Sequence, residues 1–315
     1  MNLMRYAFFT TALLWLLIPT VQAQPADWTP LLEPEQLNRL LQRHDEIRVL
    51  QVTGDYNASH IAGALNAPYA RFRGPANNAG QLPPLQDLQA LVSELGLNIS
   101  TPVVLVHQGN SASDMGAATR VYWTLKSLGL QHLAILNGGL LGWREASLPV
   151  TQIPASVEPS SFNPQWQDTW RISTATLETQ INRNSLNLID ARPLAFYLGE
   201  QATAARPGTL PGADNISYET WFDGNRMKPL PELQGLFASQ LPSADAAPVS
   251  FCNTGHWASI NWFVMSELAG IPDTRLYAES MVEWAQQPRP MANQPGRLAH
   301  YWALTTDWLR ALAGW

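Results

Sequence analysis

The residue best suited to covalent chemistry is Cys252, the single cysteine among 315 residues. It follows the apolar run 248–251, which is typical of a buried strand, and a helical pattern begins shortly after it. Gly255 supplies the backbone freedom that a tight turn between the two requires. Such a turn aims backbone N–H groups, and the positive end of the following helix, at the cysteine sulfur. This arrangement favours the thiolate, the nucleophilic form of cysteine.

The turn itself is the candidate active site. Cys252 is the candidate catalytic residue, and the candidate substrate-binding loop after it consists of Asn253, Thr254, Gly255, His256 and Trp257. For His256, substrate binding and simple loop packing both remain open. An unperturbed imidazole, with a pKa of about 6.5, would make activity depend on pH in the physiological range. Trp257 is interpreted as a pocket wall or a core residue.

Three residues outside the loop are candidates for supporting it. Asp190 and Arg192 follow the apolar run 186–189, and we expect them to form an ion pair that holds the loop rather than to contact substrate. Breaking a partly buried pair of this kind is costly. Ser259, seven residues after the cysteine, is the third candidate. The alternative for the whole site is a buried, inert thiol, which is a common state of free cysteine.

The elements that position these residues occur twice along the chain. In the first half, apolar runs at 47–52, 103–106 and 132–136 alternate with a glycine motif and a helical segment at about 117–128. In the second half, runs at 186–189 and 248–251 follow the same order. Short apolar strands that alternate with helices predict parallel sheets covered on both faces. The fold class is therefore α/β, with two tandem domains that are each a mainly parallel sheet flanked by helices.

Three segments lie outside the two predicted domains: one at the N-terminus, one between the domains and one at the C-terminus. Arg5 and the apolar run 6–18 precede Val21-Gln22-Ala23, which is typical of an export signal cleaved after Ala23. An uncleaved N-terminal anchor is the alternative. We predict a signal peptide at 1–23, an N-terminal domain at 24–150, a proline-rich linker at 151–169, a C-terminal catalytic domain at 170–290 and a helical tail at 291–315. The tail's apolar face is expected to pack on the body, with a membrane or partner surface as the alternative.

Composition excludes some classes of function. A formal net charge of −6 argues against nucleic-acid binding, which normally needs a basic face. The six histidines are scattered and there is no second cysteine, so no metal site is predicted. After cleavage of the signal, no transmembrane span is expected, and the predicted location is the periplasm or another exported compartment.

The motifs together resemble a known family. The duplicated plan is joined by two G-A-x-N motifs at 63–66 and 212–215, by Asp-Ala-Arg at 190–192 and by Cys-Asn-Thr-Gly-His-Trp-Ala-Ser at 252–259. These features look like the tandem-domain rhodaneses, a group of thiosulfate and 3-mercaptopyruvate sulfurtransferases, here of an exported bacterial type. The resemblance covers nearly all of the chain after residue 23. It implies a six-residue catalytic loop at 252–257 and an inactive first domain, where the turn 107–110 has no cysteine.

The resemblance also implies a reaction. Thiolate Cys252 would take sulfur from thiosulfate or 3-mercaptopyruvate as a persulfide, and pass it to cyanide, a thiol or a periplasmic acceptor protein. It implies no metal or organic cofactor. A non-enzymatic sulfur or selenium carrier that uses the same cysteine is the alternative, and two degenerate structural domains are a further one. A phosphatase is rejected, because that chemistry needs an arginine where this chain has Ala258.

The chain departs from the family at two places that bear on donor binding. Thiosulfate-specialised members tend to have basic residues directly after the cysteine, whereas this chain has neutral Asn253 and Thr254. Many members have an arginine where this chain has Phe196. His256 and Arg206 are the residues that we considered as sources of the missing positive charge.

Overall fold

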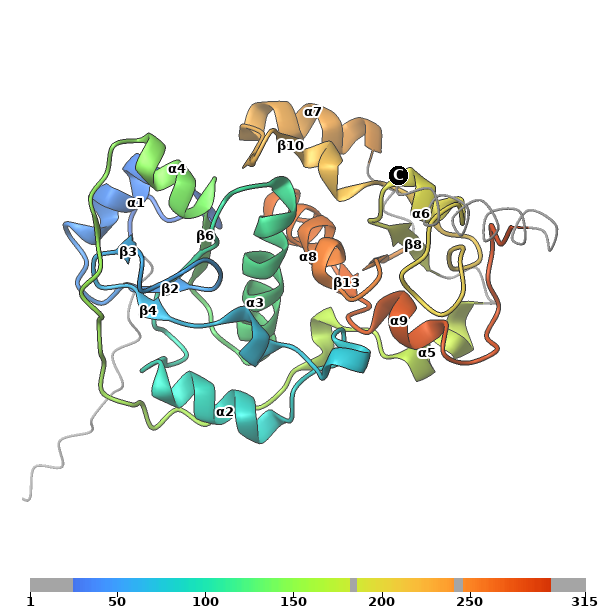
Figure 1. Ribbon diagram of the computed structural model, residues 1–315, viewed down its shortest axis with the longest axis horizontal. Helices are drawn as coiled ribbons and strands as arrows, with labels where there is room; N and C mark the ends of the chain where they lie inside the picture. Colours follow the sequence, from blue (N-terminus) through green and yellow to red (C-terminus); the bar gives the residue numbers. More distant parts are fainter. Residues whose placement is uncertain (1–24, 182–185, 241–245, 296–315) are drawn as a thin grey trace, which may run out of the picture.

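The computed structural model describes residues 25–181, 186–240 and 246–295, which form two α/β domains (Figure 1). The predicted signal peptide, at 1–23, lies outside the described residues, as does the predicted tail beyond residue 295. Among the residues that are described, no helix is long and apolar enough to cross a membrane.

The first domain is built on a parallel sheet whose strands are buried. The strand order is β1 (Leu31–Leu32), β6 (Leu133–Leu136), β5 (Val103–Val106), β2 (Arg48–Gln51) and β4 (Leu65–Asn66). Its helices are α1 (Pro34–Leu41), α2 (Leu85–Glu94), α3 (Met115–Ser127) and α4 (Gly139–Glu145). Val104 packs with residues of α1 and α4, whereas Leu105 packs with residues of α2 and α3. Both faces of the sheet are therefore covered, as the continuous apolar runs predict. A short antiparallel pair, β3 (His60–Ile61) and β7 (Val150–Thr151), lies apart from this sheet.

The second domain repeats this plan. Its parallel strands are β13 (Arg275–Leu276), β12 (Pro248–Phe251), β8 (Asn187–Asp190) and β9 (Asp214–Asn215). Its helices are α5 (Thr174–Gln180), α6 (Leu194–Tyr197), α7 (Leu230–Gln240), α8 (His256–Phe263) and α9 (Ser280–Trp284), and a hairpin, β10 (Phe222–Asp223) and β11 (Arg226–Met227), precedes α7. Side chains of α5 and α9 pack on one face of the sheet, and those of α7 and α8 pack on the other. The predicted fold class, two domains with parallel sheets flanked by helices, is confirmed.

Matching hydrogen bonds show that the two halves are copies. The indole of Trp143 donates to the Pro149 carbonyl at 2.8 Å, and Trp284 donates to Pro290 at 2.9 Å. The amide of Leu140, the second residue of α4, donates to the carbonyl of His107 at 2.8 Å. The amide of Met281, the second residue of α9, donates to the carbonyl of Cys252 at 3.0 Å. His107 of the first domain therefore corresponds to Cys252 of the second.

The domains meet where α3 packs against α8, and one apolar cluster crosses the boundary (Figure 1). The ring of Tyr122 lies edge-on to Phe263, with centroids 5.2 Å apart, and its hydroxyl donates to Glu267 at 2.8 Å. Since α8 begins immediately after the cysteine loop, this packing brings the first domain up to Cys252.

The segment 151–169 runs along the first domain rather than crossing open solvent. The Ser160 amide donates to the Ser93 carbonyl at 2.9 Å, and the Ser160 hydroxyl donates to Leu97 at 2.6 Å. Further along, the Gln167 amide donates to the Ser127 carbonyl at 2.8 Å. The segment therefore follows α2 and the end of α3 before it enters the short 3-10 helix η4 (Asp168–Trp170).

Candidate active site

Cys252 lies at the carboxyl end of β12, where open α/β sheets bind their ligands. Its thiol is free and its side chain is only 1% exposed. It opens onto a cavity of about 270 Å³. The cavity is lined by Arg73, Ser113, Thr203, Cys252, Asn253, Thr254, His256 and Trp257. The loop that the sequence predicted therefore forms most of this cavity, and the first domain completes it.

Gly255 makes the turn that ends the loop and begins α8. Its φ is +69°, a left-handed conformation that glycine adopts freely. A Cβ atom at this position would lie 2.2 Å from Nη1 of Arg120 and 2.4 Å from the carbonyl oxygen of Ala278. Both the backbone conformation and the lack of space therefore require glycine here.

Ser280, at the start of α9, fixes the loop from beneath. Its hydroxyl accepts hydrogen bonds from the amides of Cys252 and Gly255, both at 3.1 Å, and donates to the Tyr277 carbonyl at 2.7 Å. Nearby, the amide of Val282 donates to the carbonyl of Asn253 at 2.9 Å. Two amides of the loop are therefore used to hold its shape and are not directed at the sulfur.

Other loop amides remain available for an anion. Within the described part of the chain, the amides of Asn253 and Thr254 have no hydrogen-bond acceptor, and neither do the first two amides of α8. Unpaired N–H groups at the start of a helix favour negative charge. The loop can therefore stabilise a thiolate or persulfide with neutral backbone dipoles.

Asp190 and Arg192 form a buried ion pair behind the loop. Nη2 of Arg192 lies 2.6 Å from Oδ2 of Asp190, and the two side chains are 2% and 0% exposed. The hydroxyl of Thr209 donates to the same carboxylate at 2.7 Å. Nη1 of Arg192 donates to Oδ1 of Asn253 at 3.2 Å, which ties the pair to the loop. The charge of Arg192 is thus balanced, and neither residue lines the cavity.

Ser259 lies at the domain boundary and not beside the sulfur. Its hydroxyl donates to the carbonyl of His256 at 2.7 Å and lies 2.7 Å from the hydroxyl of Thr119 on α3. It therefore joins the first turn of α8 to the first domain. Ser259 therefore contacts the end of the loop where α8 begins. Asp190 and Arg192 instead lie behind the loop and contact it at Asn253.

His256 is held as a neutral ring. Its Nε2 lies 2.8 Å from the carbonyl oxygen of Ser113, and its Nδ1 lies 3.0 Å from the hydroxyl of Tyr69. Because a carbonyl only accepts, Nε2 carries the proton and Nδ1 accepts from Tyr69. Burial of the ring nitrogens, helped by the charges of Arg73 and Arg120, lowers the pKa of His256 to about 4. His256, one of the two residues considered as a source of the missing positive charge, is therefore uncharged near neutral pH and does not supply it.

Trp257 forms an aromatic wall of the cavity. Its ring stacks on Tyr218, with centroids 5.0 Å apart, and meets Phe196 edge-on at 6.1 Å. Its indole N–H donates to the hydroxyl of Ser113 at 2.8 Å. Phe196, one of the two positions at which the chain departs from the resemblance, is thus part of an aromatic group.

Comparison with known proteins places this site in a family. Residues 33–146 and 173–287 each match the family model described as the Rhodanese-like domain. The chain belongs to the rhodanese family. A Pseudomonas aeruginosa protein named "Probable 3-mercaptopyruvate sulfurtransferase" is 32% identical over 243 residues, covering 74% of this chain and 84% of its own. The thiosulfate sulfurtransferase of Azotobacter vinelandii is 28% identical, covering 82% of this chain and 94% of its own.

Solved structures agree on the fold. The crystal structure of SseA from Escherichia coli, described as a 3-mercaptopyruvate sulfotransferase, superposes with a TM-score of 0.70 and 22% identity. The match covers 80% of this rhodanese and 98% of that chain. The tandem-domain family predicted from the motifs is therefore confirmed.

The first rhodanese domain has no nucleophile at the corresponding position. His107 replaces the cysteine there, and its side chain is fully buried. Burial lowers the pKa of His107 to about 4. Among the described residues, no three or more histidine, cysteine or acidic side chains gather as a metal site.

Arg206, considered as a source of charge, is engaged elsewhere in this rhodanese. Its Nε donates to the carbonyl of Ala285 at 3.1 Å and its Nη1 donates to that of Arg289 at 3.0 Å. It does not line the cavity of Cys252. Its guanidinium group instead holds the chain that follows α9.

Sequence reasoning missed the residues that the first rhodanese domain contributes. Tyr69, in the 3-10 helix η1 (Tyr69–Phe72), and Arg73 just after it reach the loop of Cys252. Arg120, on α3, packs against Gly255. The segment 69–73 contains two arginines, but no motif distinguishes Arg73 from Arg71, which pairs with Glu94 at 2.7 Å on the surface.

Proposed function

We propose that this rhodanese is a sulfurtransferase that carries sulfane sulfur as a persulfide on Cys252. The observation that carries the proposal is the position of Cys252. It is the single cysteine of the chain, it lies at the carboxyl end of a central strand, and it opens onto a small cavity lined by a loop with unpaired amides. The named sulfurtransferases among its relatives support the same reaction class.

The proposed reaction has two transfer steps. With thiosulfate as the donor, the Cys252 thiolate attacks the outer sulfur, so that a bond from Sγ to that sulfur forms, the donor's S–S bond breaks and sulfite leaves with the electron pair. With 3-mercaptopyruvate, the donor's C–S bond breaks instead, and pyruvate leaves as its enolate with that electron pair. Cyanide or a thiolate then attacks the outer sulfur of the persulfide, and Cys252 is released as a thiolate. Neither step requires an external oxidant or reductant.

The size of the cavity supports a small donor. Its volume of about 270 Å³ lies below the range usual for drug-sized ligands, and thiosulfate and 3-mercaptopyruvate are both small anions. Trp257, against which Phe196 packs, forms an apolar wall, while Arg73 and the loop form a polar side. We propose these two donors, with cyanide, a thiol or an exported acceptor protein as the acceptor.

Intact mass spectrometry tests the persulfide. The reduced protein is incubated with thiosulfate or 3-mercaptopyruvate, and Cys252→Ser is treated in parallel. We expect wild type to gain the mass of one sulfur atom and to lose it on addition of cyanide, while Cys252→Ser gains nothing. A folded, reduced wild-type protein that gains no sulfur from either donor would overturn the proposal.

A sulfur or selenium carrier is the second candidate, favoured by one observation. Asn253 and Thr254 bring no positive charge to the donor, which would slow repeated turnover with a free dianion. A carrier would load its cysteine fully but would release little thiocyanate over many cycles. Multiple-turnover assays with thiosulfate and cyanide, normalised to the loaded fraction, separate the two functions.

We also propose that the protein is exported. The support is the sequence of 1–23, with its single arginine, its apolar run and the cleavage site after Ala23. The N-terminal sequence of protein purified from the cell envelope tests this proposal. A chain that begins at Gln24 in the exported fraction is expected, and a full-length chain confined to the cytoplasm would contradict it.

A further inference from the structure

The second domain supplies little net positive charge to its own cysteine. Asn253 and Thr254 are neutral, His256 is uncharged near neutral pH, and the charge of Arg192 is balanced by Asp190. Cys252 is buried, and a charged group in a low-dielectric interior is costly unless it is paired or hydrogen-bonded. The attacking thiolate and thiosulfate are, moreover, both anions. The neutral dipoles of the loop must therefore offset both the cost of a buried charge and this repulsion, unless another part of the protein supplies cations.

Arg120 is a buried cation at the loop. Its side chain is completely buried on α3, and it lies so close to Gly255 that a Cβ there would clash with it. Its Nη2 donates to the carbonyl of Gly80 at 2.8 Å and its Nη1 donates to that of Ala278 at 3.4 Å. Among the described residues it forms no ion pair, and its Nε has no hydrogen-bond partner.

A buried guanidinium without a paired anion is costly, so its surroundings must balance it. The acidic side chain that interacts with Arg120 is Glu279, but that carboxylate is paired with Arg171. Burial is the main cause that lowers the pKa of Arg120, to about 10, and a negative charge on Cys252 acts in the opposite direction. At neutral pH the guanidinium remains charged, and a thiolate on Cys252 can serve as its counter-ion.

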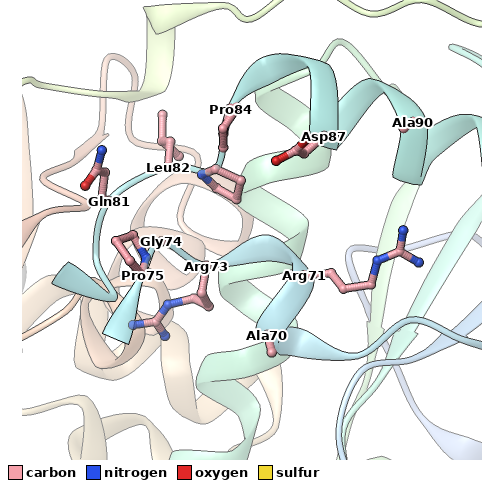
Figure 2. A pocket seen from close by; sticks show the side chains of 11 residues that line it. Ala70, Arg71, Arg73, Gly74, Pro75, Gln81, Leu82, Pro84, Asp87 and Ala90 are labelled. Atoms are coloured by element: carbon pink, nitrogen blue, oxygen red, sulfur yellow. The ribbon is translucent and has the colours of Figure 1, made fainter. Parts of the chain in front are cut away.

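Arg73 is the second cation of the first domain at this site. Its Nη2 donates to the carbonyl of Thr254 at 3.1 Å, and it lines the cavity of Cys252. It also lines a separate cavity of about 570 Å³, where Figure 2 shows the guanidinium groups of Arg71 and Arg73 extending in different directions. Of these two arginines, only Arg71 forms an ion pair within the described part of the chain, with Glu94. Arg73 thus retains its charge for the cavity.

Tyr69 connects these groups without cancelling their charge. Its hydroxyl accepts from Nη1 of Arg73 and donates to Nδ1 of His256. Burial raises the pKa of Tyr69, so the phenol is neutral at physiological pH. The charged and titratable groups that contact the loop or its neighbours are Tyr69, Arg73, Arg120, His256, Glu279 and the Asp190–Arg192 pair. Because Glu279 is paired with Arg171 and Asp190 with Arg192, the net positive charge comes from Arg73 and Arg120.

We propose that Arg73 and Arg120, both from the first domain, provide the positive electrostatic environment that holds Cys252 as a thiolate and then as a persulfide anion. The active site is then assembled from both domains, and the first domain is an electrostatic partner in the reaction. The inference rests on the proposed function where it concerns the persulfide. Where it concerns the free thiolate, it stands independently of any sulfur donor.

The test measures the ionisation of the free cysteine directly. Iodoacetamide alkylates the thiolate, and the chain's single cysteine makes the intact mass an unambiguous readout. The alkylation rate is measured as a function of pH for wild type, Arg73→Met, Arg73→Lys, Arg120→Met and Arg120→Lys. Arg71→Met is the matched control, since Arg71 lies two residues from Arg73 but outside the cavity of Cys252.

We expect each methionine variant to move the pH midpoint of alkylation upward by about one unit, as loss of a nearby opposite charge does. The lysine variants keep the charge and should remain within a few tenths of a unit of wild type, and Arg71→Met should not shift. Circular dichroism confirms that each variant is folded. If Arg120→Met does not fold, the half-buried Arg73 series still decides the question.

Unchanged midpoints in folded Arg73→Met and Arg120→Met would overturn the inference. Equal shifts in the methionine and lysine variants would also overturn it, because they would indicate lost packing and not lost charge. Failure of the proposed function looks different: wild type would show a low alkylation midpoint that depends on the arginines, yet would gain no sulfur from thiosulfate. The two outcomes are therefore distinguishable in the same samples.

Discussion

At the scale of single residues, the site depends on how tightly the loop is held. Ser280 binds two loop amides, Gly255 allows the turn, and the remaining amides are left for an anion. These contacts use backbone groups, so the chemistry of the loop depends more on its conformation than on the identity of Asn253 and Thr254.

Gly255→Ala tests this dependence. The substitution places a Cβ at a φ of +69° and 2.2 Å from Arg120, so we expect it to destabilise the fold by about 2 kcal/mol or more and to abolish persulfide loading. Gly212→Ala is the matched control. Gly212 has a similar φ of +74°, but a Cβ there meets no atom within 4 Å, so the cost should be about 1 kcal/mol with loading intact. Urea denaturation and intact mass measure the two effects, and equal losses in both variants would contradict the account.

At the scale of elements, the N-termini of two short helices and the carboxyl ends of two strands converge on the cysteine. The end of β8 supplies Asp190, the end of β12 supplies Cys252, and α8 and α9 begin around the loop. The buried ion pair of Asp190 and Arg192 connects the two strand ends through Asn253.

Asp190→Asn should break this connection. It leaves Arg192 buried and uncompensated, so we expect a loss of about 3 kcal/mol in the free energy of unfolding and slower persulfide loading. The comparison is Glu94→Gln, which breaks the exposed pair with Arg71 and should cost less than about 1 kcal/mol. Denaturant titrations of both variants provide the measurement. A cost for Asp190→Asn as small as that for Glu94→Gln would show that the pair does not support the loop.

The elements were largely predictable, because their signals are local. The run 248–251 coincides with β12, and the expected helix at about 117–128 corresponds to α3 at 115–127. Arg73 and Arg120 were not predictable, because their roles depend on how α3 packs against α8. The neutral state of His256 was not predictable for the same reason: only the packed structure shows that Tyr69 and Ser113 contact its ring nitrogens.

At the scale of the whole molecule, duplication has produced two unequal domains that share a core. The first domain has His107 at the position that corresponds to Cys252, yet it approaches the active cysteine through α3 and the segment 69–73. Domain packing is therefore a requirement of the site, and conditions that loosen it should also impair the chemistry.

Acid is one such condition. The pKa of buried His107 and that of buried His256 are both lowered to about 4, against about 6.5 in the unfolded chain. Between these values the unfolded state binds more protons, so stability is full above about pH 6.5 and falls as the pH decreases toward 4. In His107→Leu, the loss of unfolding free energy between pH 7 and pH 5 should be smaller than in wild type by about 2 kcal/mol. Urea titrations at the two pH values check this, and an unchanged pH dependence would contradict it.

The central claim is that sulfur passes through a covalent intermediate on Cys252, and steady-state kinetics test it most directly. Thiocyanate formation is measured while thiosulfate and cyanide are varied together, with Cys252→Ser as the blank. The account predicts ping-pong kinetics, with parallel lines in double-reciprocal plots, and no activity in Cys252→Ser. Intersecting lines, or activity that survives the loss of Cys252, would contradict it.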